Sequence, residues 1–166
     1  MSNVAHSQIT FTGTMFDFAV AVRFREQNEE PLRIWNVTFE RHDDGLTTAS
    51  MECAWAGDVL LAYLLSRRLP ANHVSISWLE AINAETANAT FLAGRLTSME
   101  QGDGFGFTAW NNQERIYRKT ERVYDDPDEA PFGDYTMQIV SEEPCEQLDI
   151  EGMPGPNEPI PAVGRL

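Results

Sequence analysis

Three consecutive stretches, LRIWNVTFER (residues 32–41), HDDG (42–45) and LTTASMECAW (46–55), decide the fold predicted for this chain. The outer two are rich in β-branched and aromatic residues, and the Asp-Gly pair that ends at Gly45 favours the positive backbone angles of a tight hairpin turn. In the first stretch the apolar residues move from even to odd positions after Ile34, which indicates a β-bulge or a strand covered on both faces. We therefore predict an antiparallel hairpin over these residues.

Alternation of apolar and polar residues predicts further strands on both sides of this hairpin. Between residues 16 and 24 every even position is apolar, as in a half-buried strand, and Ile9 and Phe11 indicate a shorter strand before it. The polar residues 83–89 are predicted to form a loop or turn. Later strands are predicted at residues 74–78, 91–99, 105–110, 115–124 and 135–140, which brings the total to roughly nine.

One α-helix is predicted near residues 58–69. Asp58 is a suitable N-cap, the following residues are rich in leucine, Arg67 and Arg68 suit the last turn, and Pro70 ends the helix. With so few helices, parallel βαβ units are excluded. We predict a mainly β (α+β) fold, an antiparallel β sandwich or barrel with one packed helix, spanning residues 1–140.

Length and composition agree with one folded domain. The chain has 166 residues, of which 42% are hydrophobic and 10% aromatic, enough to bury a core without disulfides. No stretch of about 18 residues is free of charged or polar groups, so we expect no membrane span. The first residues lack the basic and apolar regions of a secretory signal, so synthesis and residence in a cytoplasm are expected.

Charge divides the chain unevenly. The 26 Asp and Glu residues outnumber the 12 Lys and Arg residues, giving a net charge of −14, which argues against direct binding to nucleic acid or to an anionic membrane. Residues 121–166 contain 12 of the acidic residues, two basic ones and seven of the nine prolines. Proline restricts this region to extended conformations, so residues 141–166 are predicted to form an acidic C-terminal arm. Such an arm is held by an assembly or lies back across its own domain.

No catalytic, metal or cofactor site is predicted. His6, His42 and His73 have no second ligand at a metal-binding spacing, and His42 falls in the hairpin turn. The glycines at positions 102, 104 and 106 precede a strand, whereas a phosphate-binding loop opens a helix, so a hairpin turn is the better interpretation.

An enzyme with a scattered site is the third function class considered. Cys53 is a conceivable nucleophile, but Met51 lies on the same face of the predicted strand, which points to a buried thiol in the core. Arg95, Glu52 and Glu80 are candidates for a site assembled from distant residues, although nothing in the sequence brings them together.

The candidate interface residues are charged. The acidic residues from Asp125 to Glu129 lack the spacing of a calcium loop, and the only basic cluster, residues 115–122, alternates between two faces of a strand. We expect this strand to pair with the acidic residues that follow it, within one molecule or between copies. The full set is Asp125, Asp126, Asp128, Glu129, Glu142, Glu143, Glu146, Asp149, Glu151, Arg115, Arg118, Lys119 and Arg122.

Two segments carry a resemblance to a known group of proteins. Val74-Ser-Ile-Ser-Trp-Leu-Glu-Ala81 and Phe91-Leu-Ala-Gly-Arg-Leu-Thr-Ser-Met-Glu-Gln-Gly-Asp-Gly-Phe-Gly-Phe-Thr-Ala109 resemble the strand–turn–strand pattern of β domains in bacteriophage tail-tip and baseplate proteins. The similarity covers under a quarter of the chain and uses common hairpin residues. It implies a non-enzymatic building block of a virion, repeated in a ring, with an extended arm that reaches a neighbour and with no catalytic residues.

The leading hypothesis is therefore a structural or assembly subunit of a virus particle, in a phage tail or connector. Its partners would be other protein subunits, as a homo-oligomer or a multi-protein assembly, and its location the virion or the host cytoplasm. The alternative is a phage- or plasmid-encoded inhibitor whose carboxylates imitate nucleic-acid phosphates and block a host defence nuclease, of the anti-CRISPR or anti-restriction type.

Overall fold

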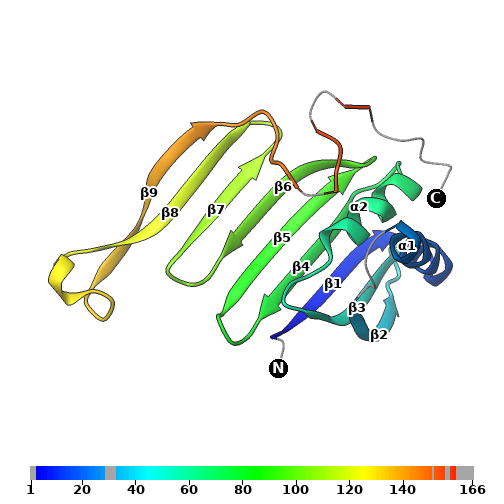
Figure 1. Ribbon diagram of the computed structural model, residues 1–166, viewed down its shortest axis with the longest axis horizontal. Helices are drawn as coiled ribbons and strands as arrows, with labels where there is room; N and C mark the ends of the chain where they lie inside the picture. Colours follow the sequence, from blue (N-terminus) through cyan, green and yellow to red (C-terminus); the bar gives the residue numbers. More distant parts are fainter. Residues whose placement is uncertain (1–2, 29–32, 151, 156–157, 160–166) are drawn as a thin grey trace.

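The computed structural model describes residues 3–28, 33–150, 152–155 and 158–159 (Figure 1). The elements within them are β1 (Val4–Thr12), α1 (Met15–Asn28), β2 (Ile34–Arg41), β3 (Leu46–Ala54), α2 (Val59–Arg68), β4 (Val74–Glu80), β5 (Glu85–Leu92), β6 (Arg95–Gly102), β7 (Gly106–Asn111), β8 (Ile116–Tyr124), the 3-10 helix η1 (Pro127–Glu129) and β9 (Tyr135–Pro144). No helix among the described residues combines the length and apolarity needed to cross a membrane.

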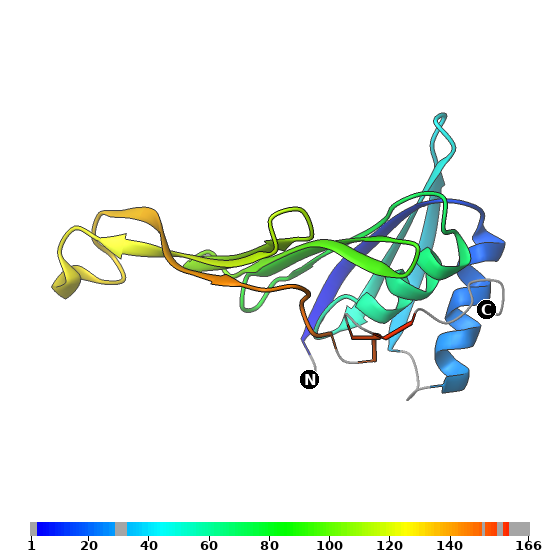
Figure 2. The ribbon, with the colours of Figure 1, turned by 90° about the horizontal axis from the view of Figure 1, so that it is seen from above.

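All the described strands belong to one antiparallel sheet with the order β2-β3-β1-β4-β5-β6-β7-β8-β9. The mainly β, antiparallel α+β fold predicted from the sequence is confirmed. The sheet stays open instead of closing into a barrel, and α1 and α2 form a second layer on one of its faces (Figure 2). The described residues therefore contain one α-helix more than the sequence predicted.

The core lies between the helices and the strands in the first half of the sheet. Every second side chain of β1 and β4 is buried, and Ile9, Phe11 and Ile76 are among those buried on the face toward the helices. Leu61 and Leu65 of α2 are fully buried against them. Each such side chain contributes roughly 1.5–3 kcal/mol to folding.

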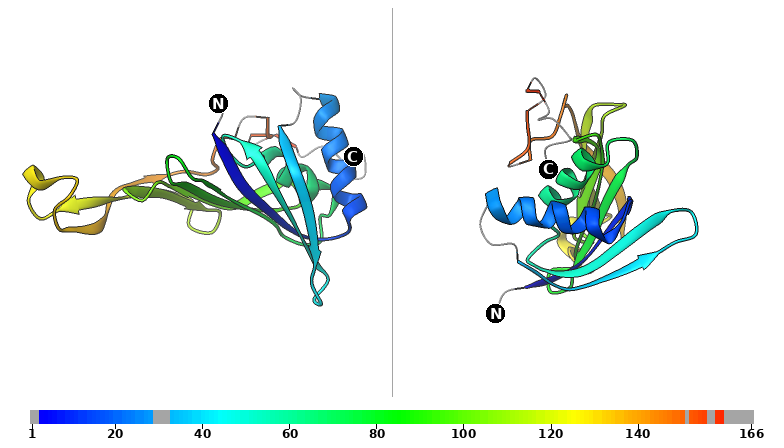
Figure 3. Two further views of the ribbon diagram at one scale, coloured as in Figure 1. Left: turned by 90° about the horizontal axis from the view of Figure 1, so that it is seen from below. Right: turned by 90° about the vertical axis from the view of Figure 1, so that its right-hand side faces the viewer.

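The β2–β3 hairpin and α2 match their predictions. The amide of His42 donates to the carbonyl of Leu46 at 2.8 Å, and the register shifts between Trp35 and Thr38, so the predicted bulge is confirmed. The carboxylate of Asp58 accepts a hydrogen bond from the amide of Leu61 at 3.0 Å and caps α2. Figure 3 shows the hairpin extending past the body of the sheet.

The strand predicted at residues 16–24 is wrong, because these residues form α1. A capping box starts the helix. The amide and hydroxyl of Thr14 both donate to the Asp17 carboxylate, at 2.8 Å and 3.0 Å, while the amide of Asp17 lies 3.4 Å from that hydroxyl. Phe18 and Ala21 are buried together at a helical spacing, while Phe16 is exposed, so the even-numbered apolar residues do not share a face.

Asp17 also joins the two helices, which makes its contribution to stability pH-dependent. Burial favours a raised pKa for Asp17, but the Thr14 hydrogen bonds and the Arg68 guanidinium, 2.9 Å away, outweigh it and lower the pKa. The ionised form is thus favoured in the folded state. The contribution of Asp17 to the free energy of unfolding is therefore fully present above the pKa of the unfolded state, and it is lost as the pH falls through the pKa of the folded state.

We predict that Asp17→Asn lowers the free energy of unfolding by about 1 kcal/mol at neutral pH. The difference from wild type should shrink as the pH falls through the lowered pKa of Asp17. Urea unfolding at a series of pH values measures this, with Asp43→Asn in the exposed hairpin turn as the charge-matched control. A gap between Asp17→Asn and wild type that stays constant down to the acid limit would contradict the prediction.

The loop predicted at residues 83–89 and the strand predicted at 91–99 also need correction. Most of the predicted loop belongs to β5, and a tight turn at Ala93-Gly94 divides the predicted strand between β5 and β6. Both turn residues have positive φ, 49° for Ala93 and 79° for Gly94. Alanine seldom adopts this conformation. The turn was not predicted because its sequence, Ala-Gly, contains only the glycine of the usual Asn-Gly pair. The amide of Gly94 donates to the buried Ser66 hydroxyl at 3.0 Å, which holds the turn against α2.

Candidate assembly interface on the β8–β9 arm

The last two strands of the sheet project away from the helices. We call residues 116–144, which comprise β8, η1 and β9, the arm. Figures 1 and 2 show that neither helix covers it and that η1 lies at its far end. Within β9, every side chain except that of Ser141 is exposed. In the arm, β9 therefore presents side chains to solvent on both faces, while most side chains of β8 are half-buried.

An arginine held between aromatic rings occupies the face of the arm that points away from the helices. The guanidinium carbon of Arg122 lies 4.9 Å from the ring centroid of Phe105 and 4.2 Å from that of Tyr135. The Tyr124 and Tyr135 rings are 5.8 Å apart. Arg122 pairs in register with Met137, so both side chains lie on this face. We call these five residues the aromatic–arginine cluster.

The outer edge of the arm carries an uncharged apolar stretch. Residues 135–140 read Tyr-Thr-Met-Gln-Ile-Val, and all six are exposed on a strand that ends the sheet. The backbone groups on the outer side of an edge strand are free to pair with another strand. Natural edge strands are usually protected by charged residues. The only charged residues of β9, Glu142 and Glu143, lie at its end nearest the body. A register shift between Lys119 and Thr120 bends this end of the pair.

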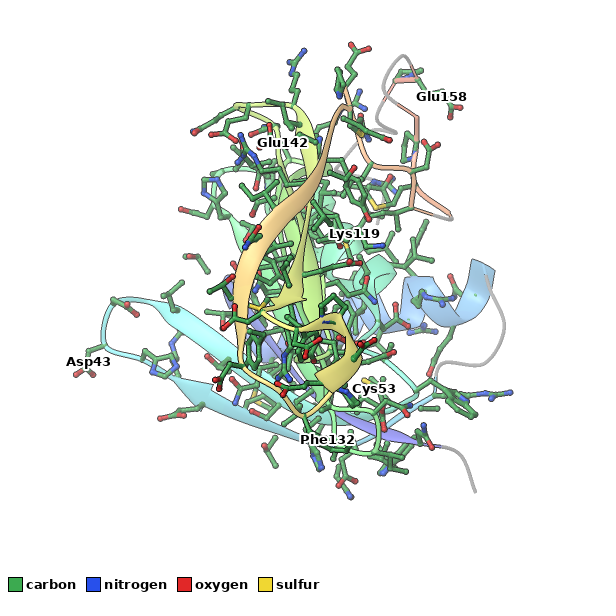
Figure 4. The ribbon with its side chains drawn as sticks, turned by 90° about the vertical axis from the view of Figure 1, so that its left-hand side faces the viewer. Asp43, Cys53, Lys119, Phe132, Glu142 and Glu158 are labelled. Atoms are coloured by element: carbon green, nitrogen blue, oxygen red, sulfur yellow. The ribbon has the colours of Figure 1, made fainter. Side chains whose placement is uncertain are left out.

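Acidic residues gather at the far end of the arm. Residues 125–134 contain five acidic residues and no basic ones. The Asp126 carboxylate accepts from the amide of Asp128 at 3.0 Å and caps η1, while Asp125, Asp128 and Glu129 are exposed. Phe132, 95% exposed, lies among them (Figure 4). A basic surface with an apolar recess would complement this end.

Two of the four basic residues of the predicted interface, Arg118 and Lys119, pair with nearby carboxylates. Arg118 binds Glu114, which precedes β8, and its Nε lies 3.3 Å from Glu142, the one acidic residue after β8 with which it forms an ion pair in the described structure. Lys119 lies on the opposite face, 3.0 Å from Glu121, and that hydrogen bond raises its pKa.

Arg115 is outside β8, in the preceding turn, where its φ is 55°. Its Nε donates to the Asn112 carbonyl at 3.3 Å. The basic cluster therefore forms no continuous stripe.

The segment after β9 returns to the body. The amide of Cys145 donates to the carbonyl of Arg115 at 2.8 Å, and the indole of Trp110 donates to the carbonyl of Cys145 at 2.8 Å. Leu148, Ile150 and Met153 then pack against the core. Glu146 and Asp149 are exposed along this path, and Glu151 lies outside the described residues.

The predicted C-terminal arm, residues 141–166, thus has two parts in the structure. Residues 141–144 complete β9, and the described residues beyond them lie over the helix-bearing face (Figure 1). The element that projects is the β8–β9 hairpin, and the described residues from Cys145 to Met153 pack on their own domain.

The face of the sheet away from the helices differs between the body and the arm. Across β3, β1, β4 and β5 it carries short polar side chains in register: Thr48, Thr10, Ser75 and Thr90 in one row, and Ser50, Gln8, Ser77 and Asn88 in the next. On the arm the same face carries the aromatic–arginine cluster, with Phe107 and Ile139 paired to either side of Thr120. Exposed apolar side chains are more frequent on the arm, although Trp35 and Leu79 are exposed in another row of this face on the body.

The residues considered for catalysis have structural contacts. Cys53 is buried, as predicted, and burial raises its pKa to about 11, so it is a protonated thiol at neutral pH. His42 lies in the hairpin turn, with its Nε2 3.0 Å from the Thr48 hydroxyl. The glycines from 102 to 106 form the predicted turn between β6 and β7. Among the residues described, no group of three or more His, Cys, Asp or Glu side chains is placed to hold a metal ion.

The three scattered candidates do not come together. The buried carboxylate of Glu80 accepts from the amides of Ile82 and Asn83, both at 2.9 Å, and closes the β4–β5 turn. Glu52 accepts from the side chain of Asn36 at 2.6 Å. Arg95 donates to the backbone carbonyls of Gly155 and Glu158. Each is engaged in a separate local structure.

Sequence reasoning selected charged residues and missed the apolar ones at the same place. Phe105, Tyr135, Met137 and Ile139 read as ordinary half-buried strand residues, because alternation does not show whether a second layer covers the sheet. One signal could have revealed their exposure. No helix is predicted after residue 70, so no helix is expected to cover the later strands. No protein-family model, curated protein or solved structure matches this chain.

Proposed function

We propose that this protein is a non-enzymatic structural subunit of a virus particle, a component of a phage tail or connector, and that its arm docks on a neighbouring copy. The observation that carries the proposal is the exposed, uncharged edge stretch of residues 135–140 beside the aromatic–arginine cluster. The two β segments that resemble phage tail-tip domains fold as β4 and as the β5–β7 region next to the arm. Such a subunit acts in the virion and in the host cytoplasm before assembly.

The composition of the arm supports an interface more than a solvated loop. Tyrosine, arginine, phenylalanine and methionine are enriched at protein–protein interfaces, and tyrosine and arginine dominate their binding hot spots. Arg122 already lies between Phe105 and Tyr135, and its buried Nε has no hydrogen-bond partner among the described residues. A neighbour that supplies an acceptor would satisfy this donor. The side chain is thus preorganised for binding.

The arrangement of charge supports a head-to-tail contact between copies. The acidic far end of the arm has no basic residue of its own, while seven of the 12 basic residues of the chain precede residue 100, four of them in α1 and α2. Contact between two different surfaces of one chain generates rings or filaments. An arm that reaches the body of the next copy fits that symmetry.

The acidic inhibitor remains the competing function. Its support is the cluster of five acidic residues between Asp125 and Asp134. These residues gather at one end around exposed Phe132 instead of lining a long face, as a nucleic-acid mimic would require. Binding of such an inhibitor to a nuclease would weaken steeply with salt and would compete with DNA.

We predict that the triple variant Phe132→Ser, Met137→Ser and Ile139→Ser remains monomeric under conditions in which wild type assembles. Each change removes an exposed apolar side chain, so the fold should be retained while the apolar contact is lost. Sedimentation velocity over a range of protein concentrations measures the assembly. The matched control is Met15→Ser, Leu79→Ser and Ile82→Ser, which removes exposed apolar side chains from the body.

The control should assemble as wild type does. A wild-type chain that stays monomeric at the highest concentrations, or an arm variant that assembles normally, would refute the proposal. DNA competition at two ionic strengths, with a defence nuclease as the probe, would then test the inhibitor function.

A further inference from the structure

A second candidate site lies on the opposite side of the molecule from the aromatic–arginine cluster. A pocket of about 380 Å³ opens between α1, α2 and the returning C-terminal segment. Apolar side chains form most of its wall, joined by Tyr63, two arginines and one glutamate. Among the lining residues are Arg25 of α1, Leu60, Tyr63, Leu64 and Arg67 of α2, and Met153 of the returning segment.

Arg67 is the unusual member of this wall. It belongs to the last turn of α2 and is only 6% exposed. Its guanidinium carbon lies 5.5 Å from the ring centroid of Tyr63 and 5.9 Å from that of Phe24. Its Nε is buried without a hydrogen-bond partner, and no salt bridge joins it to a carboxylate of the described residues. A buried cation is unfavourable unless an anion or acceptors compensate it.

Two more donors lie beside Arg67. Arg25 is held by Asp58 through its Nε, at 3.4 Å, which leaves its buried Nη1 without a hydrogen-bond partner. Burial raises the pKa of Tyr63, an effect that Arg67 and Arg95 partly offset, so its hydroxyl stays protonated at neutral pH. The wall thus combines a hydroxyl and an apolar surface with two guanidinium groups, each of which has one buried nitrogen without a hydrogen-bond partner.

We propose that this pocket binds a small carboxylate with an apolar body. The carboxylate would accept hydrogen bonds from Arg67 and Arg25, and the body would lie against Leu60, Leu64 and Met153. An arginine presents several donors in a plane, which matches the two oxygens of a carboxylate. Glu158 in the wall disfavours a doubly charged anion, and the apolar wall disfavours a small inorganic one.

Octanoate is the probe, and octanamide of the same length is its uncharged counterpart. We expect isothermal titration calorimetry on the full chain to detect octanoate binding that Arg67→Met weakens at least tenfold, because the anion loses its main charged donor. Octanamide should bind wild type more weakly than octanoate does, and Arg67→Met should leave its affinity unchanged. The matched control is Arg68→Met, since the neighbouring Arg68 binds Asp17 and does not line the pocket. It should keep octanoate affinity within about twofold of wild type.

Thermal unfolding gives a second measurement that does not depend on calorimetric heat. Octanoate should raise the Tm of wild type and of Arg68→Met but not that of Arg67→Met. Without ligand, Arg67→Met should be at least as stable as wild type, since it removes a buried charge that has no carboxylate partner among the described residues. The proposal is overturned if octanoate leaves wild type unaffected, if octanamide or inorganic phosphate stabilises it equally well, or if Arg67→Met binds octanoate normally.

Discussion

Gly106→Ala is expected to lower the free energy of unfolding by about 3 kcal/mol and to abolish assembly through the arm. An added Cβ at this position would lie 2.5 Å from the backbone oxygen of Thr120 and 3.1 Å from the side chain of Glu121. Such a Cβ requires β8 to move, because the closest atom belongs to the backbone and cannot rotate away as a flexible side chain does. The position is therefore restricted to glycine by close approach.

The displacement of β8 should reach the aromatic–arginine cluster. The amide of Arg122 donates to the carbonyl of Phe105 at 3.0 Å, just beyond the crowded position. If β8 moves away from β7, this hydrogen bond and the contact of Arg122 with Phe105 are lost together. Amide hydrogen exchange along β8 and β9 should then be faster in the variant than in wild type.

Gly104→Ala is the matched control, two residues away in the same turn. Gly104 has a φ of 88° and nothing within 4 Å of an added Cβ, so alanine would be strained there but would crowd no strand. We expect Gly104→Ala to lower stability by about 1 kcal/mol and to leave exchange in β8 unchanged. Equal effects of the two substitutions, measured by urea unfolding and hydrogen exchange, would show that close approach at Gly106 does not position the arm.

The strand pattern of the body could be predicted because local residues determine it. Strict alternation in β4 and the Asp-Gly turn between β2 and β3 reflect one buried face and one turn geometry, and both can be recognised from sequence. The α1 segment could not be recognised in the same way, because its apolar residues fit a strand. Thr14 and Asp17 were the better signal, since a Thr-x-x-Asp capping box marks a helix start. The described residues contain nine strands, as many as were predicted, because α1 replaced one predicted strand and β5 supplied another.

The candidate interface could be predicted only in part, because exposure is a property of the whole fold. The net charge directed attention to Asp125, Glu142 and their neighbours, and the structure does place these residues on the arm or beside it. The apolar part, from Tyr135 to Val140, depends on the order of strands in the sheet and on which strands the helices cover. Arg67 became a candidate only when its burial and its lack of a carboxylate partner were known.

Trp110→Ala is expected to lower the free energy of unfolding by roughly 3–5 kcal/mol, the range measured for aromatic residues removed from protein cores. Trp110 is 3% exposed and is the last large buried side chain of the core on the side of the arm. Its indole also holds the carbonyl of Cys145, where the chain leaves β9 and turns back over the body. Its removal therefore leaves a cavity and also frees the start of the returning segment.

Trp110→Phe separates these two effects, because phenylalanine fills most of the space but cannot donate to the Cys145 carbonyl. We expect an intermediate loss of roughly 1–3 kcal/mol, from the unsatisfied carbonyl and the smaller ring. Trp55→Ala is the control for indole removal, since Trp55 is 54% exposed and should change stability by less than about 1.5 kcal/mol. Guanidinium unfolding curves measure all three variants.

Whether the returning segment stays bound to the body should depend more on the hydrogen bond from Trp110 to Cys145 than on the cavity. Limited proteolysis after residue 145 should be faster in both Trp110 variants than in Trp55→Ala, because both lose the donor that fixes the carbonyl of Cys145. Octanoate should also lose affinity for both, since Met153 and Pro154 reach their pocket only through this segment. If Trp110→Phe were cleaved as slowly as wild type, the packing of Leu148 and Ile150 on the core would suffice to hold the segment, and the indole would act through its volume alone.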